Sequence, residues 1–211
     1  EKYKALVEKG ATACGSPGEV AGQSDVIFTI VGYPQDVEEV YFGDKGILSS
    51  VKKGSILVDM TTSEPAIARK IAEAAAEKGV GALDAPVSGG DVGAREGKLA
   101  IMVGGTKSVF DEVYPMFELM GSNIKLLGDA GAGQDTKMCN QILIASTMIG
   151  VVESLLYAWK AGLDLDEVIN VIGSGAASSW SINNLGRRIV VGDYGPGFFI
   201  RHFNIEEVLA C

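Results

Sequence analysis

The stretch "SILVDMTTSEPAIARKIAEAAAEKGVGALDAP" (residues 55–86) places an amphipathic segment between two short apolar runs. The runs "SILVDM" and "GALDAP" are mostly apolar at consecutive positions, which is typical of strands covered on both faces of a sheet. Between them, Ser63 with Pro65 two residues later is a start signal for a helix, and Gly79 is a stop signal. The stretch therefore predicts a strand, a helix and a second strand of an α/β fold.

The same alternation continues on both sides of this stretch. Short apolar runs alternate with amphipathic segments from Val26 to Leu127, whereas the chain after Gly128 has only helical patterns. The segment "GAGQDTKMCNQILIASTMIGVVESLLYAWKAG" has no helix breaker for about eight turns of 3.6 residues. We predict an α/β domain with a Rossmann-like doubly wound sheet in residues 1–129, followed by an all-helical domain in residues 130–211.

Composition and charge limit the partners. The formal net charge is −9, which disfavours nucleic acid and acidic membrane surfaces because both are densely negative. Three widely spaced cysteines without a C-x-x-C pair argue against a disulfide framework or a zinc site and for a reducing compartment, the cytoplasm or an organelle matrix. The longest apolar run, Ile142–Val152, is shorter than the roughly 20 residues of a membrane span, so we expect a buried helix and no membrane partner.

Three small residues, Ser88, Gly89 and Gly90, directly follow the apolar run "GALDAP". Open α/β sheets bind ligands at the carboxyl edge of their strands. Consecutive backbone N–H groups without Cβ obstruction, together with a serine hydroxyl, suit a carboxylate there. The alternative is an ordinary turn, in which glycine is the default residue.

A polar face begins the long helical segment, where Lys137, Asn140 and Gln141 stand at positions i, i+3 and i+4. A lysine on an otherwise apolar segment can point into a cleft, and burial there would lower its pKa toward the range of a general acid. The alternative is a solvated surface lysine with polar neighbours.

Other segments carry weaker signals. The loops "VGYPQD" (residues 31–36) and "DMTTSEP" (residues 59–65) follow strands, where a cofactor could approach, but each is equally consistent with an ordinary strand-to-helix loop. The string "GDAGAGQ" resembles G-x-G-x-x-G, although Thr136 replaces the third glycine, so we interpret it as a flexible entry to the long helix. The only histidine, His202, has aromatic and apolar neighbours and is expected to be a packed residue.

Taken together, "DAPVSGG", "AREGKL", "MVGG" and "GAGQDTKMCNQ", in this order, resemble the β-hydroxyacid dehydrogenase family. This family includes 3-hydroxyisobutyrate dehydrogenase, tartronate semialdehyde reductase and glyoxylate/succinic semialdehyde reductase. The resemblance extends from Glu1 to about Phe203 and favours the functional interpretations of the loops and of the lysine. It also implies that residues 1–129 are part of a dinucleotide-binding domain, and residues 130–211 part of a domain for substrate binding and dimerisation.

The resemblance implies a reaction and its residues. The family reaction is hydride transfer between the nicotinamide of NAD or NADP and the carbonyl of a small semialdehyde or 2-oxo acid, without a metal, in a homo-oligomer (a dimer or tetramer). Lys137 would be the general acid or base. The other implied residues are Asn140 as the polar partner of the lysine, Ser88, Gly89 and Gly90 for the substrate carboxylate, Phe198 against the substrate, and Tyr33, Pro34 and Thr62 for the cofactor.

The sequence also departs from the family pattern. The N-terminal strand and glycine-rich loop of the family are absent, and "RHF" leads into "NIEEVLAC" where a Lys-Asp pair is expected. We therefore expect an incomplete copy of the family fold. The choice between NAD and NADP stays open, because the residues that make it would precede Glu1. Asp135 adds a negative charge beside Lys137 in sequence.

Two alternatives remain. A 6-phosphogluconate dehydrogenase relative would need a His-Asn pair at the third and fourth positions after the lysine, where Asn140 and Gln141 stand instead. A non-catalytic oligomerisation or interaction module would use the long helix from Gly133 to Lys160 to pair subunits.

Overall fold

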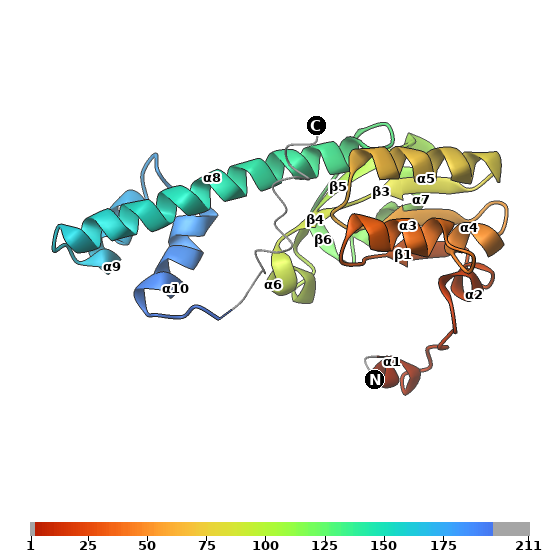
Figure 1. Cartoon of the computed structure of the whole chain (residues 1–211), viewed down its shortest axis with the longest axis horizontal. Helices are drawn as coiled ribbons and strands as arrows, with labels where there is room; N and C mark the ends of the chain where they lie inside the picture. Colours follow the sequence, from red (N-terminus) through yellow and green to blue (C-terminus); the bar gives the residue numbers. More distant parts are fainter. Residues whose placement is uncertain (1–2, 196–211) are drawn as a thin grey trace. The chain divides into compact units, whose positions relative to one another are not determined.

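The structure, a computed structural model, describes residues 3–195 and divides the chain into two compact units (Figure 1). The first unit is Glu1–Lys137 and the second is Met138–Cys211. The division falls inside the long helix α8 (Ala132–Lys160), after the Asp129 boundary expected from the sequence.

The first unit alternates strands and helices. Its elements are α1 (Lys4–Val7), α2 (Pro17–Ala21), β1 (Val26–Thr29), α3 (Pro34–Phe42), α4 (Ile47–Ser50), β2 (Ile56–Asp59), α5 (Pro65–Glu77), β3 (Gly81–Asp84), β4 (Val87–Ser88), α6 (Gly90–Arg95), β5 (Leu99–Gly105), α7 (Lys107–Phe117), β6 (Gly121–Gly128) and the start of α8.

These strands form one mixed sheet. β1, β2 and β3 are parallel neighbours, which confirms the strand–helix–strand unit predicted for residues 55–86. β5 then runs antiparallel to β3, pairs antiparallel with β4 and parallel with β6. The α/β fold is thus confirmed, with an antiparallel step that the alternation of runs did not reveal.

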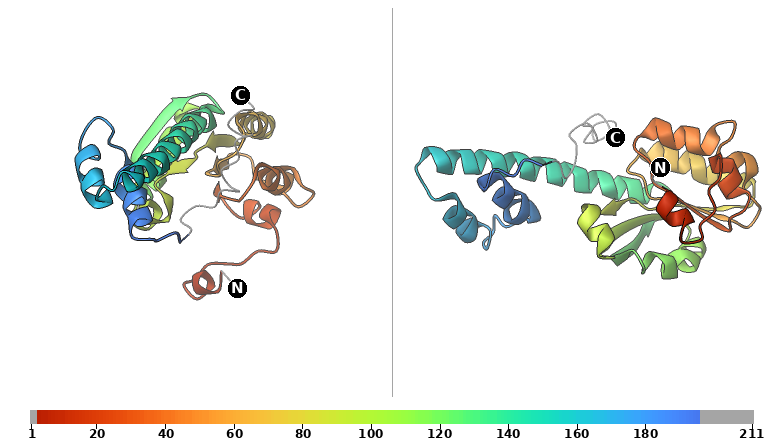
Figure 2. Two further views of the ribbon diagram at one scale, coloured as in Figure 1. Left: turned by 60° about the vertical axis from the view of Figure 1, so that its left-hand side comes forward. Right: turned by 90° about the horizontal axis from the view of Figure 1, so that it is seen from below.

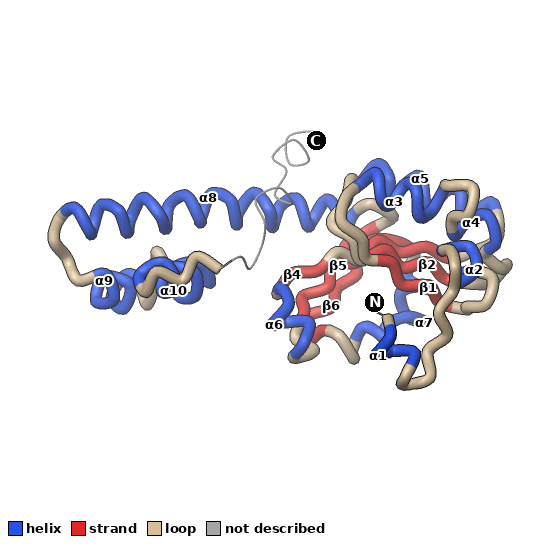
Figure 3. Tube along the Cα trace, turned by 60° about the horizontal axis from the view of Figure 1, so that its bottom comes forward, coloured by secondary structure: helices blue, strands red, loops and turns tan. Residues whose placement is uncertain are grey.

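Helices cover both faces of the sheet, as Figure 3 shows for α3, α4 and α5 on one side and α7 on the other. Side chains of a strand alternate between faces. In β2, Ile56 and Val58 pack in the cluster that contains α7, whereas Leu57 packs in the cluster that contains α3 and α5. Both faces of the sheet are therefore buried at β2, which explains the consecutive apolar residues of this strand.

The second unit is a small helical assembly. After the rest of α8 come α9 (Leu165–Ile172), η1 (Ser181–Gly186) and α10 (Arg187–Val190), which fold back along the second half of α8 (Figure 2). Their core consists of Val151 and Leu155 of α8, Ile169 of α9 and Ile182 of η1.

The expectation that Ile142–Val152 forms a buried helix is wrong. Leu143 is 68% exposed and Ile149 is 61% exposed, because the three short helices of this unit cover only the stripe of α8 that contains Val151 and Leu155. By length and composition, α8 is also apolar enough to cross a membrane, with a mean hydropathy of 1.7 over its most apolar window.

Candidate active site

The Ser-Gly-Gly segment lies where β4 meets α6. Ser88 ends β4 and pairs with Ala100 of β5, and its side chain is half-buried. Gly89 and Gly90 have φ angles of 132° and 62°, which L side chains rarely adopt, and both are exposed. The glycines are thus required by the backbone conformation, and a Cβ at Gly90 would meet nothing within 4 Å.

Lys137 lies beside this segment. Its ammonium Nζ donates a hydrogen bond of 2.8 Å to the carbonyl oxygen of Val87, the residue before Ser88. Lys137 is only 8% exposed, and burial lowers its pKa to about 8. The alternative of a solvated surface lysine is therefore wrong, and the group has the acidity of a proton donor at neutral pH.

The first turn of α8 is fixed against β3 and β5. The Asp84 carboxylate, at the end of β3, accepts hydrogen bonds from the backbone N–H groups of Gly131 (2.8 Å) and Gln134 (2.9 Å). Burial raises the pKa of Asp84, and these N–H donors oppose the rise. A Cβ at Gly133 would lie 2.5 Å from the carbonyl oxygen of Met102. The interpretation of "GDAGAGQ" as a flexible entry is therefore wrong: its glycine permits close docking of the helix.

Sequence reasoning missed Asp84 and Gln134. Gln134 has no exposed surface, and its side-chain amide hydrogen bonds to the loop between β2 and α5. The only signal in the sequence was a polar residue one helical turn before Lys137, on the face that the lysine shares.

The two loops expected to contact the cofactor lie next to each other, because β1 and β2 are parallel neighbours. The backbone N–H of Val31 donates to the Thr61 hydroxyl across 3.0 Å and so links the loops. Tyr33 precedes α3, Pro34 begins it, and Thr62 follows β2; all three are half-buried.

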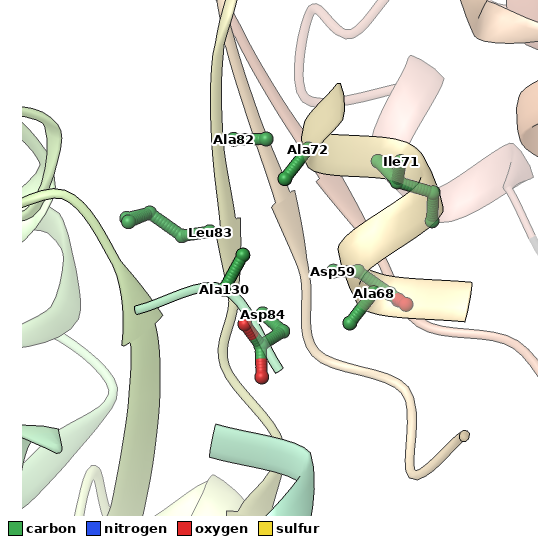
Figure 4. A pocket seen from close by; sticks show the side chains of 8 residues that line it. All are labelled: Asp59, Ala68, Ile71, Ala72, Ala82, Leu83, Asp84 and Ala130. Carbon is green, nitrogen blue, oxygen red and sulfur yellow. The ribbon is translucent and has the colours of Figure 1, made fainter. Parts of the chain in front are cut away.

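Two buried carboxylates line a small pocket beside these loops (Figure 4). Asp59 and Asp84 come from the ends of adjacent strands, and residues of α5 and β3, with Ala130, form the remaining wall. Burial raises the pKa of Asp59 to about 6, against hydrogen bonds from Thr61 that lower it, and the negative charge of Asp84 adds to the rise.

Other predicted residues are placed as follows. Asn140 belongs to the second unit, is half-buried and donates to the Gln141 side chain across 3.0 Å. Asp135 is exposed and pairs with Arg69 of α5 at 3.4 Å, so its carboxylate is engaged at the surface. Phe198 and His202 lie outside the described residues.

Comparison with known proteins decides the family. Residues 1–128 match the model of the NAD binding domain of 6-phosphogluconate dehydrogenase, and residues 131–204 match that of the NAD-binding domain of NADP-dependent 3-hydroxyisobutyrate dehydrogenase. An uncharacterised oxidoreductase of Bacillus subtilis is 55% identical over 96% of this chain and 70% of its own length. The chain belongs to the β-hydroxyacid dehydrogenase family. Members of this family are NAD(P)-dependent hydroxyacid dehydrogenases.

Relatives in this family include a probable 3-hydroxyisobutyrate dehydrogenase-like protein of Arabidopsis thaliana, 51% identical over the whole chain and 63% of the relative. The 2-hydroxy-3-oxopropionate reductase of Escherichia coli is 43% identical over 92% of the chain and 67% of the relative. The crystal structure of 3-hydroxyisobutyrate dehydrogenase from Salmonella typhimurium superposes with a TM-score of 0.84 at 31% identity, covering 98% of this chain and 73% of that one. The chain spans 63% to 70% of the length of these curated relatives.

One observation bears on whether the described residues fit the cofactor. The Ser63 hydroxyl, at the start of α5, is buried without a hydrogen-bond partner among residues 3–195. It lies in the loop after β2, at the carboxyl edge where open α/β sheets bind nucleotides. A cofactor bound at this edge would supply the hydrogen bond that this hydroxyl lacks.

Proposed function

We propose that the protein reduces a small semialdehyde or 2-oxo acid with NAD(P)H, or oxidises the corresponding hydroxy acid, with Lys137 as general acid and base. The observation that carries this proposal is the buried Lys137 ammonium, bonded to the Val87 carbonyl next to the Ser-Gly-Gly segment. Substrates of the 3-hydroxyisobutyrate, glyoxylate or succinic semialdehyde class all combine a carboxylate with a nearby carbonyl or hydroxyl group.

Each end of such a substrate has a counterpart. The Ser88 hydroxyl and the backbone N–H groups of Gly89 and Gly90 receive the carboxylate, since consecutive backbone N–H groups can bind anions. Nζ of Lys137 then faces the carbonyl oxygen and gives it a proton as negative charge develops there. Because burial lowers the lysine pKa to about 8, the ammonium releases this proton more readily than a solvated lysine does. Asn140, one turn further along α8, holds the substrate oxygen.

The cofactor supplies the hydride when it is bound. Tyr33 and Pro34 from the loop after β1, and Thr62 from the loop after β2, contact its nicotinamide half. Positioning of the two reactants accounts for much of the rate, as in other hydride transfers between bound groups. The 6-phosphogluconate dehydrogenase alternative receives less support, because the helical half matches the 3-hydroxyisobutyrate dehydrogenase model.

We also propose that the protein is a homo-oligomer of the cytoplasm or an organelle matrix. A helix that is apolar on all faces is covered by a core, by another subunit or by lipid. Glu153 lies in the middle of the exposed apolar part of α8, and a carboxylate at the centre of a bilayer costs about 2.5–3.5 kcal/mol, which favours a second subunit. Sedimentation tests this: a dimer or tetramer supports the proposal, and a monomer contradicts it.

A fluorescence titration of the full chain with NADPH and, in parallel, NADH tests the cofactor. Saturable binding, followed by oxidation of the preferred nucleotide in the presence of glyoxylate or succinic semialdehyde, is the expected result. A folded protein that binds neither nucleotide would contradict the enzymatic proposal and favour a non-catalytic interaction module.

A further inference from the structure

The side-chain amide of Gln134 is held at both of its ends. Its Nε2 donates to the carbonyl oxygen of Thr61 across 2.7 Å, and its Oε1 accepts from the backbone N–H of Ser63 across 3.0 Å. Gln134 is fully buried, so both polar atoms need these partners. Of the uncharged side chains of this length, only glutamine donates and accepts through one planar group.

Thr61 connects this amide to the other cofactor loop. Its backbone N–H donates to the Asp59 carboxylate across 3.1 Å, and its hydroxyl accepts from the backbone N–H of Val31 across 3.0 Å. Val31 lies in the loop after β1, which contains Tyr33 and leads to Pro34 at the start of α3. Through Thr61, the amide of Gln134 is thus linked to both loops that we propose as the nicotinamide site.

Gln134 also precedes Lys137 by one helical turn, on the same face of α8. The backbone N–H of Gln134 is bound by the Asp84 carboxylate, so this turn is fixed by its main chain on one side and by its side chain on the other. Two anchors of different direction prevent rotation of the helix about its axis. The charged groups around this turn are Asp84 of β3, Asp59 of β2 and the surface pair of Asp135 with Arg69.

We infer that Gln134 is a positioning residue that sets Lys137 relative to the two cofactor loops. This inference rests on the proposed function for its catalytic consequence, but the geometric link between the lysine and the loops does not require turnover. Because of this link, a change of the Gln134 amide should alter both the affinity for the cofactor and the pKa of Lys137.

The test compares Gln134→Met, which keeps the length of the side chain and removes both hydrogen bonds, with Gln134→Glu. For Gln134→Met we expect kcat/KM to fall about 10- to 100-fold, the penalty of a misplaced catalytic group, and cofactor binding to weaken. In Gln134→Glu, only the protonated carboxyl can donate to the Thr61 carbonyl, so we expect activity and affinity to recover as the pH is lowered. Asp135→Asn, on the exposed side of the same turn, is the matched control and should change neither quantity.

A second measurement does not depend on activity. The rate at which an amine-acetylating reagent modifies Lys137, followed by peptide mass spectrometry over a pH series, reports the protonation of the lysine. The Lys137 side chain of the wild-type protein should titrate near pH 8, and that of Gln134→Met should titrate at a higher pH because its lysine is less tightly held in its buried position.

The outcomes separate the inference from the proposed function. A shifted Lys137 titration and weaker nucleotide binding support the inference even if no substrate of the panel is turned over, in which case the proposed function fails alone. Variants that lose thermal stability but keep the wild-type Lys137 titration and nucleotide affinity overturn the inference, since Gln134 would then be only structural. If Gln134→Met does not fold, Gln134→Glu provides the test. Recovery of its activity and nucleotide affinity at lower pH supports the inference, and no recovery overturns it.

Discussion

Replacement of Asp59 by asparagine should stabilise the protein at neutral pH. Asp59 is 3% exposed, and burial raises its pKa from 3.8 to about 6. A carboxyl group with a raised pKa in the folded state favours folding while it is protonated, so its contribution is fully present below pH 4 and is lost as the pH rises through about 6. The rise of the pKa from 3.8 to about 6 corresponds to about 3 kcal/mol, since a tenfold change in an equilibrium constant is roughly 1.36 kcal/mol.

Asparagine keeps an oxygen that can accept the hydrogen bond from the Thr61 N–H and removes the charge. The free energy of unfolding of Asp59→Asn minus that of wild type should therefore rise by about 2.5 kcal/mol between pH 4 and pH 7.5, because part of the effect has already occurred at pH 4. Urea unfolding followed by circular dichroism over this range measures the difference. Asp25→Asn, the same substitution at a side chain that is 98% exposed, controls for the loss of one negative charge from a chain of net charge −9.

A difference between Asp59→Asn and wild type that stays constant over this pH range would refute the reasoning. The Asp59 carboxylate would then be as well solvated or as well bonded in the folded protein as in the unfolded chain. In that case water would reach the hydrogen-bond network of Asp59, Thr61 and Gln134.

Three further predictions follow from single contacts. Gly133→Ala should lower the free energy of unfolding by about 1–3 kcal/mol, because its Cβ would lie 2.5 Å from the Met102 carbonyl oxygen. At Gly150 in the same helix, a Cβ would meet nothing within 4 Å, so Gly150→Ala should raise the free energy of unfolding by about 0.5–1 kcal/mol in urea unfolding. Equal effects of the two substitutions on this free energy would contradict the close docking of Gly133. Ser63→Ala removes a buried hydroxyl without a partner among the described residues, so stability should hold or rise by up to about 1 kcal/mol while nucleotide titration shows weaker binding; lost stability at unchanged affinity would contradict this. The rate of carbonyl reduction should fall as the pH rises through about 8, where Lys137 loses its proton, and a steady-state rate that increases across this range would exclude the lysine as the acid.

Much of the α/β half could be predicted from local patterns. The consecutive apolar residues of β2 and β3 indicated strands with two buried faces, and the Ser63, Pro65 and Gly79 signals bounded α5 within a residue or two. The Ser-Gly-Gly segment and the lysine were singled out as local features, small residues after a strand and a charge on an apolar helix, and the family resemblance favoured their functional interpretation. That Lys137 contacts Val87 is a property of the fold, which no spacing along the chain reveals.

Two features escaped prediction for physical reasons. Asp84 and Gln134 are polar, and a pattern of hydropathy assigns such residues to the surface, although their partners are backbone groups that only the folded chain brings near. The exposure of α8 could not be predicted either. A helix that is buried by its own chain and a helix that is buried by another molecule both have apolar residues on every face. The sequence pattern therefore does not tell which of the two covers α8.

The most direct test of the central claim is the rate of NADPH or NADH oxidation with glyoxylate and succinic semialdehyde by wild type and by Lys137→Ala, measured beside nucleotide affinity. The account predicts that Lys137→Ala loses about 10²- to 10⁴-fold in turnover, the contribution of a general acid, and binds the nucleotide as wild type does. A Lys137→Ala variant that turns over as fast as wild type would contradict it.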